Sequence, residues 1–411
     1  MNLIFLTSFF LDSKESQFLR YSKGKPIAFA NSSFQKALLT GFSEINENNI
    51  NRIVCLNQPN IGAFPFNYSK FYYDTDNYSF HDIEVREVSF VNIAYLKHLH
   101  KRLKIKKTLE NELRNSEETV IICYDLYGPW LKTLKELKNK FKFKVVVIIP
   151  DLPDLTGTPE TLLYKLYKLL PNYNPLSEID VADGFVLLAP NMVNALSIEN
   201  MPNLILEGIY LPDVTNVGVQ KHKKQSNSSD FTILYSGALS KRNGIEDLVS
   251  AIQSIDDCDI KLKLYGAGEL VRDIIKITEQ DPRIEYMGQI GHSELLKELT
   301  KADLLINPRD PQAEFASYSF PSKTMEYMAS GTPVLMYKLP SLPQEYHQHL
   351  YFINNSGVEG IASAIKRVMN IPLMERRKVG EGAAGFILLN KNPKTQAKAV
   401  LDFIFNNIID K

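Results

Sequence analysis

The chain has 411 residues, of which 44% are hydrophobic and 23% charged; this is the composition of a folded protein and excludes a mainly disordered one. Its length exceeds the size at which a single hydrophobic core stops growing, so we expect two domains. The 47 basic and 47 acidic residues balance, which argues against a protein that coats nucleic acid, because phosphate binding needs a surplus of positive charge. Cys55, Cys123 and Cys258 lie far apart, which argues against a disulfide framework or a zinc site and fits a reducing cytoplasm.

The first apolar segment, Leu3–Leu11, resembles the core of a secretion signal. No Lys or Arg precedes it, and Asp12-Ser13-Lys14-Glu15 follows in place of a small-residue cleavage site, so we interpret it as a buried strand. The longest later apolar run, Val145–Ile149, is far shorter than the roughly 20 residues that a membrane-spanning helix needs. The sequence therefore predicts a cytoplasmic protein.

Short β-branched runs alternate with segments of helical period in both halves of the chain, as is typical of βαβ units around a parallel sheet. The predicted fold class is α/β, with two doubly wound Rossmann-like domains facing a cleft. Strands are expected at Asn2–Thr7, Arg52–Leu56, Val120–Tyr124, Lys144–Ile149, Gly184–Leu188, Leu204–Glu207, Phe231–Ser236, Lys261–Tyr265, Arg283–Met287, Asp303–Asn307 and Val334–Tyr337. Helices are expected near Phe34–Phe42, Asn92–Arg114, Leu131–Asn139, Pro159–Leu170, Asn191–Ile198, Ile245–Ile255, Gly268–Thr278, Ser293–Thr300, Ser322–Ala329, Val358–Asn370 and Thr395–Ile408.

The stretch 211–230 has no hydrophobic period and is rich in small and polar residues, which indicates an exposed linker. We therefore expect a first domain at 1–210, the linker at 211–230, and a second domain at 231–392. A last helix within 393–411 could cross back to the first domain.

The segment from Asn307 to Val334 carries the strongest chemical signal. A strand is expected to end at Asn307 and a helix to begin at Pro321-Ser322, because Pro suits the first helical turn and Ser is a good N-cap. A helix start offers unpaired N–H groups to an anion, and Lys323 adds positive charge there. Glu326 follows one turn later, within reach of hydroxyl groups beside a bound phosphate. The alternative is an ordinary surface Lys–Glu pair.

This segment resembles the signature of retaining GT-B glycosyltransferases of the family 4 type, in which Glu-x7-Glu precedes Met-Ala-x-Gly-x-Pro-Val. Glu326 matches the second glutamate and 328–334 match the turn, whereas the first glutamate falls on Tyr318. The Tyr-Ser-Phe-Pro-Ser-Lys-x-x-Glu-Tyr variant is similar to a subset of bacterial enzymes that build cell-surface polysaccharide. The resemblance implies that Glu326 holds the ribose of a nucleotide-sugar and that the position of Tyr318 contacts the transferred sugar.

The second segment, 235–244, is expected to contain the end of a strand, a glycine turn and two cations, Lys241 and Arg242. Together they could bind anionic oxygen. The segment resembles the Gly-Arg-Leu-x-x-x-Lys-Gly loop of the same family, whose Arg and Lys grip the donor diphosphate. Ala238 and Asn243 stand at those two positions, so we expect Lys241, Arg242, Lys323 or Arg309 to supply the charge. The alternative is a solvated Lys-Arg turn.

Two further loops, 266–269 and 287–292, match the parts of the family that form a glycine turn and border the nucleotide base. Alone, Gly266-Ala267-Gly268 is weak evidence for a dinucleotide site because the third glycine is absent, and both loops could be simple strand–helix turns. The predicted donor-binding residues are Gly237, Lys241, Arg242, Gly266, Gln289, Ile290, Arg309, Ser319, Pro321, Ser322, Lys323 and Glu326.

In the first half, Tyr124 and Asp125 follow a predicted strand where the family often places a histidine near the reacting sugar. Asp151 and Asp154 follow the next strand, at the sheet edge where open α/β sheets bind ligands, and could meet an acceptor hydroxyl or cap a helix. The predicted catalytic residues are Tyr124, Asp125, Tyr318 and Lys323, and the predicted acceptor-side residues are Asp151 and Asp154.

Other patterns point to no metal site. Asp74-Thr75-Asp76 spells the Asp-x-Asp of metal-dependent transferases but follows no clear buried strand, so we interpret it as a turn, and the histidines show no metal-binding spacing. We expect neither a metal nor another cofactor.

A basic stretch, Lys97–Lys144, carries thirteen Lys or Arg against six acids. Most such runs are solvated helix faces; alternatively this one docks on the inner face of the anionic cytoplasmic membrane, through Lys132, Lys135 and Lys138.

The whole pattern predicts a metal-independent hexosyltransferase that moves a sugar with retention from a nucleotide-sugar to a glycan or lipid-linked acceptor, in capsule or exopolysaccharide biosynthesis. Its expected partners are that donor, that acceptor and the membrane surface, and no nucleic acid. Two alternatives are a non-catalytic GT-B partner subunit, suggested by Tyr318, Ala238 and Asn243, and a nucleotide-sugar epimerase or hydrolase.

Overall fold

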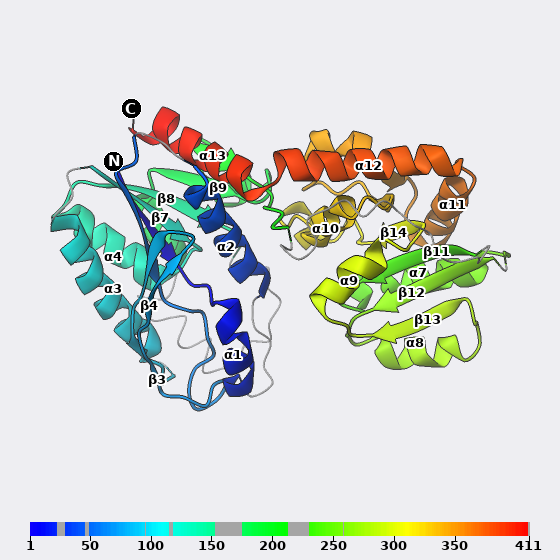
Figure 1. Cartoon of the computed structure of the whole chain (residues 1–411), viewed down its shortest axis with the longest axis horizontal. Coiled ribbons are helices and arrows are strands. Elements are labelled where there is room, and N and C mark those ends of the chain that lie inside the picture. The colour runs from blue at the N-terminus through cyan, green and yellow to red at the C-terminus, as the bar shows by residue number, and fades with distance from the viewer. Residues whose placement is uncertain are drawn as a thin grey trace. The chain divides into compact units, whose positions relative to one another are not determined.

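The computed structural model describes residues 1–22, 29–45, 49–94, 96–114, 118–152, 175–212, 230–257 and 259–409. They form two compact units, each with its own sheet and core (Figure 1). The first unit comprises Met1–Ile209 and Pro393–Lys411, and the second comprises Tyr210–Asn392. The predicted helix Pro159–Leu170, Asp154, Cys258 and most of the predicted linker lie outside the described residues.

The first unit is built on an eight-stranded sheet in the order β10-β9-β8-β7-β1-β2-β5-β4, in which only β4 runs antiparallel to its neighbour. The central strands β1, β7 and β8 are almost entirely buried, which explains their continuous runs of mainly apolar residues. The strands are β1 Asn2–Thr7, β2 Arg52–Asn57, β4 Asn77–Phe80, β5 Ile83–Glu87, β7 Thr119–Tyr124, β8 Lys144–Ile149, β9 Gly184–Leu187 and β10 Asn203–Ile205, with a small antiparallel pair β3 Tyr72–Tyr73 and β6 Phe90–Val91 beside them.

Helices cover both faces of this sheet, with α2 and α13 on one face and α3 and α4 on the other (Figure 1). The last helix, α13, packs closely on α2, because Gly41 lets the Pro393 carbonyl approach so near that a Cβ atom at Gly41 would lie 2.0 Å from that oxygen. The helices are α1 Glu15–Tyr21, α2 Phe29–Ser43, α3 Lys97–Arg114, α4 Gly128–Lys138, α6 Met192–Ala195 and α13 Pro393–Ile404, with a π turn at Phe405–Ile409.

The second unit has a six-stranded, fully parallel sheet in the order β13-β12-β11-β14-β15-β16. The strand order reverses between β11 and β14, and open α/β sheets bind ligands beyond the carboxyl ends of strands at such a point. The strands are β11 Phe231–Ser236, β12 Ile260–Tyr265, β13 Ile284–Gly288, β14 Leu304–Asn307, β15 Val334–Tyr337 and β16 Tyr351–Ile353. The helices are α7 Ile245–Ser254, α8 Val271–Thr278, α9 His292–Leu299, α10 Lys323–Ala329, α11 Gly357–Met369 and α12 Leu373–Asn390.

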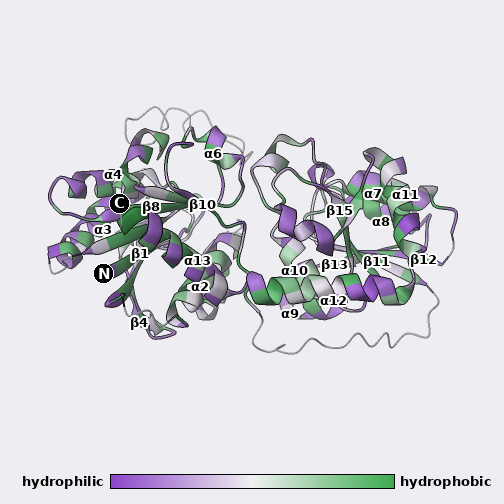
Figure 2. Cartoon of the chain, turned by 90° about the horizontal axis from the view of Figure 1, so that it is seen from above, coloured by the Kyte–Doolittle hydropathy of each residue, from purple (hydrophilic) through white to green (hydrophobic). Residues whose placement is uncertain are grey.

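The α/β fold class is confirmed, and the predicted strands that lie in the core have nearly the expected bounds. In both units the sheets are mainly hydrophobic, whereas the helices carry both hydrophobic and hydrophilic residues (Figure 2). None of the helices in the described part of the chain is long and apolar enough to span a membrane.

Some elements differ from the prediction. The sequence analysis missed β3 to β6, β16 and the 18-residue helix α12, which contains glycines where a sequence-based prediction expects a helix to break. Gly380 is required there because a Cβ atom would lie 2.1 Å from the Gly331 carbonyl oxygen. The helix expected from Asn92 begins at Lys97, because the Asn92 backbone instead bonds to Phe64 and Phe71.

Candidate functional site

The candidate site of the second unit lies at the carboxyl ends of β11 and β14. Three segments meet there: the turn after β11, the loop between β14 and α10, and the first turn of α10. Tyr327 fixes α10 to the strand end, since its hydroxyl accepts a hydrogen bond from the Ser236 N–H at 2.7 Å and donates to the Ser236 carbonyl at 3.1 Å. The strand end and the helix are therefore held in one arrangement.

The turn after β11 packs against the Gly-Ala-Gly turn after β12. The Gly237 N–H donates to the Tyr265 carbonyl at 2.9 Å, and the Leu239 N–H donates to the Ala267 carbonyl at 2.8 Å. Gly266 has a φ of 135°, and a Cβ atom there would lie 1.9 Å from the Gly237 carbonyl oxygen. These glycines therefore allow the two turns to pack together. This packing is a structural reason for the Gly-Ala-Gly pattern.

Lys323 occupies the centre of the site. Its Nζ atom donates to the Tyr235 hydroxyl at 2.8 Å and lies 4.2 Å from the centre of the Tyr235 ring. A Cβ atom at Gly237 would lie 2.4 Å from this Nζ, so the glycine makes room for the ammonium group. Burial, reinforced by the charge of Arg309, lowers the pKa of Lys323 to about 7.

Arg309 and Arg242 flank the ring of Phe315, with their Cζ atoms 4.9 Å and 3.7 Å from the ring centre. The Nε and Nη1 atoms of Arg309 are buried and have no hydrogen-bond partner among the described residues. Burial lowers the pKa of Arg309, and the charge of Arg242 adds to this effect. Buried guanidinium N–H groups normally find acceptors, so Arg309 is arranged for a ligand that brings anionic oxygen.

Gly244 explains how these two arginines meet. It has a φ of 74°, and a Cβ atom there would lie 2.0 Å from the Pro308 carbonyl oxygen. The loop that carries Arg309 therefore rests directly on the turn that follows Arg242. A larger residue at 244 would separate the two cations.

Glu326 lies one turn after Lys323 in α10. Burial raises the pKa of its carboxyl group, while the charges of His292 and Lys323 act in the opposite direction. His292 is the first residue of α9, directly after the loop that contains Gln289 and Ile290. The loop predicted to border the nucleotide base is thus close enough for its histidine to influence the Glu326 carboxylate.

Several predicted donor-site residues lie outside this cluster of cations. The Lys241 side chain is exposed and pairs with Glu246 at 3.1 Å, while Gln289 is exposed. Ser322 is exposed and occupies the expected N-cap position of α10, but its hydroxyl makes no capping hydrogen bond. Tyr318, Ser319 and Ile290 are partly buried, and Pro321 is buried, next to α10 or α9 in sequence.

Asn243, at the position where the resembled family has a lysine, serves the backbone. Its side-chain amide donates to the Ala238 carbonyl at 3.1 Å and to the Ser240 hydroxyl at 3.0 Å. The positive charge of the site comes instead from Arg242, Arg309 and Lys323, three of the four cations that we expected to supply it.

In the first unit, Tyr124 and Asp125 lie at the carboxyl end of β7. Asp125 has a φ of 78°, which is unusual for a residue other than glycine and is tolerated best by Asp and Asn. Burial and the charge of Asp151 raise the pKa of Asp125 to about 6, although its carboxylate accepts a hydrogen bond from the Leu126 N–H at 2.7 Å. Asp151 follows the neighbouring strand β8, so two predicted carboxylates share this sheet edge.

The patterns judged less promising have ordinary structural roles. Asp74 and Asp76 are exposed between β3 and β4, and Asp76 pairs with Lys14 at 3.1 Å. His98 bonds to the Tyr127 hydroxyl at 2.7 Å. In the described part of the chain no group of three or more His, Cys, Asp or Glu is placed to hold a metal ion.

The basic stretch also differs from a free cationic face. Lys135 pairs with Glu178 and Asp180, and Lys138 pairs with Asp183 at 2.6 Å. Two of the three lysines that we expected to contact a membrane are therefore already paired with acids.

The sequence analysis missed four residues that shape the second-unit site: Tyr235, His292, Phe315 and Tyr327. All four lie in segments singled out from the sequence, but each acts through a partner far away in the sequence, which the local pattern does not reveal.

Comparisons with known proteins agree with this geometry. Residues 230–370 match the family model described as glycosyl transferases group 1, and these residues contain the whole candidate site of the second unit. No curated protein sequence matches the chain significantly. Together with the fold, the family match supports a GT-B glycosyltransferase.

Solved structures resemble the whole chain at low sequence identity. The match to sucrose-phosphate synthase of Thermosynechococcus elongatus covers 100% of this chain and 100% of that protein's chain, with 14% identity and a TM-score of 0.61. The lipopolysaccharide outer core galactosyltransferase WaaB, in its apo form, covers 99% of this chain and 100% of its own, with 13% identity and a TM-score of 0.63. HepE of Anabaena, in complex with UDP, covers 98% of this chain and 100% of its own, with 12% identity and a TM-score of 0.61. At these identities the likeness establishes the fold of two Rossmann-like α/β units.

Proposed function

We propose that this glycosyltransferase moves a hexose from a nucleoside diphosphate sugar to a glycan or lipid-linked acceptor, with retention and without a metal ion, in cell-surface polysaccharide biosynthesis. The observation that carries the proposal is the partly buried guanidinium of Arg309, whose buried Nε and Nη1 atoms lack hydrogen-bond partners in the described part of the chain, close to the ammonium group of Lys323. A donor diphosphate brings both the negative charge and the acceptor oxygens that these groups lack.

The cations have a catalytic reason to be there. As the bond from the anomeric carbon to the diphosphate breaks, negative charge develops on the leaving oxygen, and cations fixed in advance stabilise that charge. Arg309 and Lys323 are held by Phe315 and Tyr235, so they need little rearrangement when the charge develops. Positively charged side chains can therefore take the place that a metal ion has in other transferases.

The remaining steps follow from the retaining chemistry of the resembled family. The acceptor hydroxyl attacks from the face that the diphosphate leaves, forming the new carbon–oxygen bond, and its proton passes to the departing phosphate oxygen. We assign Glu326 to the ribose hydroxyls and Tyr318 to the transferred sugar. Tyr124, Asp125 and Asp151 are proposed to meet the sugar and the acceptor.

The test is the release of nucleoside diphosphate from UDP-, GDP- and dTDP-sugars in the presence of EDTA. We expect slow release from one donor and its loss in Glu326→Ala, whereas Glu381→Ala, which changes an exposed glutamate of α12, should behave as the native chain does. EDTA-sensitive release would contradict the metal-independent part of the proposal.

The rival functions give different results in the same assay. Product formation at the full rate without any acceptor would indicate an epimerase or hydrolase. If no donor is turned over, nucleotide binding to the same samples is measured, and the absence of binding would indicate a non-catalytic partner subunit.

A further inference from the structure

The first two turns of α3 have an inverted pattern of burial. Lys97 and Lys101 face the interior, while Leu99 and Leu103 are 51% and 56% exposed, and Leu96, just before the helix, is 54% exposed. Spacings of three and four residues place these leucines on one side of the helix. We call Leu96, Leu99 and Leu103 the leucine face.

The buried lysines show that the inversion is built into the fold. Lys101 donates to the carbonyls of Gln58 and Pro59, both at 3.0 Å, and Lys97 donates to the carbonyl of Ile61. These bonds fix the rotation of the helix about its axis. The leucine face therefore points outward because polar bonds on the opposite side hold it there.

An exposed loop that carries Phe66 and Phe71, which we call the aromatic loop, is bonded to the segment before this helix. Phe66 and Phe71 are 64% and 61% exposed. The loop is tied to the segment that leads into α3, because the Asn92 side-chain amide donates to the carbonyls of Gly62 and Lys70 and the Asn92 N–H donates to the Phe71 carbonyl. β3, which follows this loop, pairs with β6, and β6 packs against α3. Five large apolar side chains are thus exposed in one region of the first unit.

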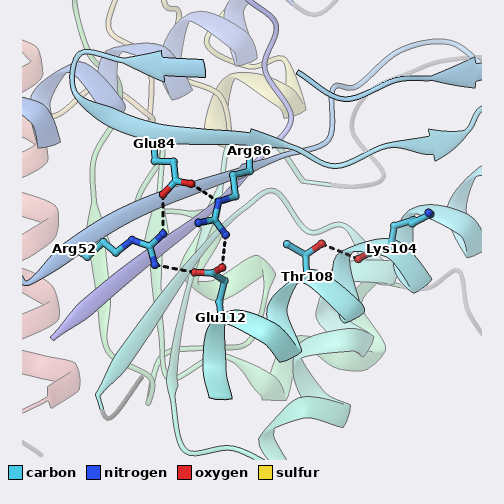
Figure 3. A network of polar contacts seen from close by, with 6 residues as sticks. All are labelled: Arg52, Glu84, Arg86, Lys104, Thr108 and Glu112. Atoms are coloured by element: carbon cyan, nitrogen blue, oxygen red, sulfur yellow. Dashed lines mark hydrogen bonds and ion pairs between the residues drawn. The ribbon is translucent and has the colours of Figure 1, made fainter. Parts of the chain in front are cut away.

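The charge around the leucine face is positive. Of the six basic residues from Lys97 to Lys107, Lys97 and Lys101 are buried and Arg102 and Lys106 pair with Glu136 of α4, which leaves Lys104 and Lys107. Lys104 and Lys107 are exposed and form no ion pair with any described residue. Of the two acids farther along the helix, Glu110 pairs with Lys140 and Glu112 is engaged by Arg52 and Arg86. Lys104 points away from the Glu112 network (Figure 3).

Two exposed acids follow the aromatic loop in the sequence. Asp76 pairs with Lys14, and the Asp74 carboxylate accepts a hydrogen bond from the Thr75 N–H at 2.8 Å. Neither belongs to α3. The helix itself therefore presents leucines and unpaired lysines together.

We propose that the leucine face of α3, together with Phe66 and Phe71, docks on the surface of an anionic lipid bilayer. Exposed leucines and phenylalanines enter the boundary between headgroups and acyl chains, and the neighbouring lysines contact anionic headgroups. Contiguous apolar patches of this kind mark interaction surfaces on proteins that are otherwise soluble. This surface replaces the one formed by Lys132, Lys135 and Lys138 that the sequence suggested.

The proposal is tested by sedimentation of the full chain with vesicles, without any substrate, so its outcome is independent of the proposed transferase reaction. Vesicles of phosphatidylcholine with phosphatidylglycerol are compared with vesicles of phosphatidylcholine alone. We expect binding to the anionic vesicles and loss of at least about tenfold in affinity in Leu99→Gln/Leu103→Gln. Neutralising Lys104 and Lys107 together should weaken binding roughly tenfold, more strongly at low salt.

Two controls make the result specific. Met374→Gln/Leu389→Gln changes apolar residues that are 73% and 72% exposed on α12 of the second unit, and should bind as the native chain does. Phe66→Ser/Phe71→Ser provides a second test if the leucine variant melts at a lower temperature than the native chain.

Three results would overturn the proposal. The native chain could fail to sediment with anionic vesicles, or the leucine and phenylalanine variants could bind unchanged. Alternatively, sedimentation velocity could show that the native chain self-associates and that the leucine variant is monomeric while vesicle binding is absent, which would identify the leucine face as a contact between copies.

Discussion

The ammonium nitrogen of Lys323 lies 2.8 Å from the hydroxyl oxygen of Tyr235 and 4.2 Å from the centre of its ring. Tyr235 is at the end of β11 and Lys323 is in the first turn of α10, 88 residues later. This pair holds a partly buried cation, and none of the described carboxylates is directly bonded to it. The fold therefore keeps a positive charge in an unfavourable place, which we interpret as preparation for an anionic ligand.

The first prediction is that Lys323→Met stabilises the protein and abolishes turnover. The pKa of Lys323 falls from 10.5 to about 7 on folding, so the charged form is disfavoured in the folded state at neutral pH. An apolar side chain of similar length avoids this unfavourable burial, and Tm should rise by several degrees. Lys297→Met, at an exposed position of α9, should change neither Tm nor turnover. A lower Tm in Lys323→Met would contradict the interpretation.

A second prediction concerns pH. Below pH 7 Lys323 is charged in the free site, and above it the ammonium group is increasingly neutral. Binding of an intact nucleotide-sugar, whose diphosphate does not titrate in this range, should weaken as pH rises through about 7. Titration calorimetry in buffers of different ionisation enthalpy should show net proton uptake on binding near pH 8. The same measurements on Lys323→Met should show neither effect.

Replacement of Arg309 separates charge from geometry. Its two buried nitrogen atoms, Nε and Nη1, have no hydrogen-bond partner within the described residues, so a diphosphate should gain a hydrogen bond to each on binding. Loss of hydrogen bonds to a charged group is worth about 1.5–3 kcal/mol, so Arg309→Met should weaken donor binding about tenfold to a hundredfold. Arg309→Lys should recover part of this, because a lysine cannot reproduce the fork of the guanidinium group.

The matched control for this series is Arg272→Met, which changes an exposed arginine of α8 and should leave donor binding unchanged. Equal binding by the native chain and Arg309→Met would remove Arg309 from the proposed site.

Two glycine-to-alanine variants should differ sharply in Tm. In Gly266→Ala the new Cβ atom would lie 1.9 Å from the Gly237 carbonyl oxygen, at a φ of 135° that alanine rarely adopts. We expect a loss of donor binding and a lower Tm, because the two turns must separate. Gly291→Ala places its Cβ atom in open space and should retain the native Tm, as measured by circular dichroism.

Asp125 gives a prediction in the first unit. The pKa of its carboxyl group rises from the ordinary value of 3.8 to about 6 in the folded protein. The folded state therefore loses stability as pH rises from 3.8 to about 6. Asp125→Asn, which keeps a residue suited to the φ of 78°, should therefore be more stable at pH 8 by about 1–3 kcal/mol. This gain should vanish below about pH 4, as measured by urea unfolding. An equal gain at both pH values would rule out the carboxylate as its cause.

Local sequence patterns determined the fold class and most core elements. β11 and β7 were placed almost to the residue, because buried parallel strands are continuous runs of β-branched residues bounded by turns. Helix α12 was missed because its glycines lower helix propensity, and the reason for one of them, Gly380, is its close approach to Gly331 in the folded chain.

The tertiary structure alone decided which side chains act together. Arg242, Arg309 and Lys323 were named as candidates from the sequence, but their grouping depends on Phe315, Tyr235 and Gly244, which bring separate loops into contact. The same holds for α3, where lysines face inward because the carbonyls of a distant loop need donors. Periodicity is a local property of the chain, whereas burial, pKa and charge pairing depend on residues that only folding brings together.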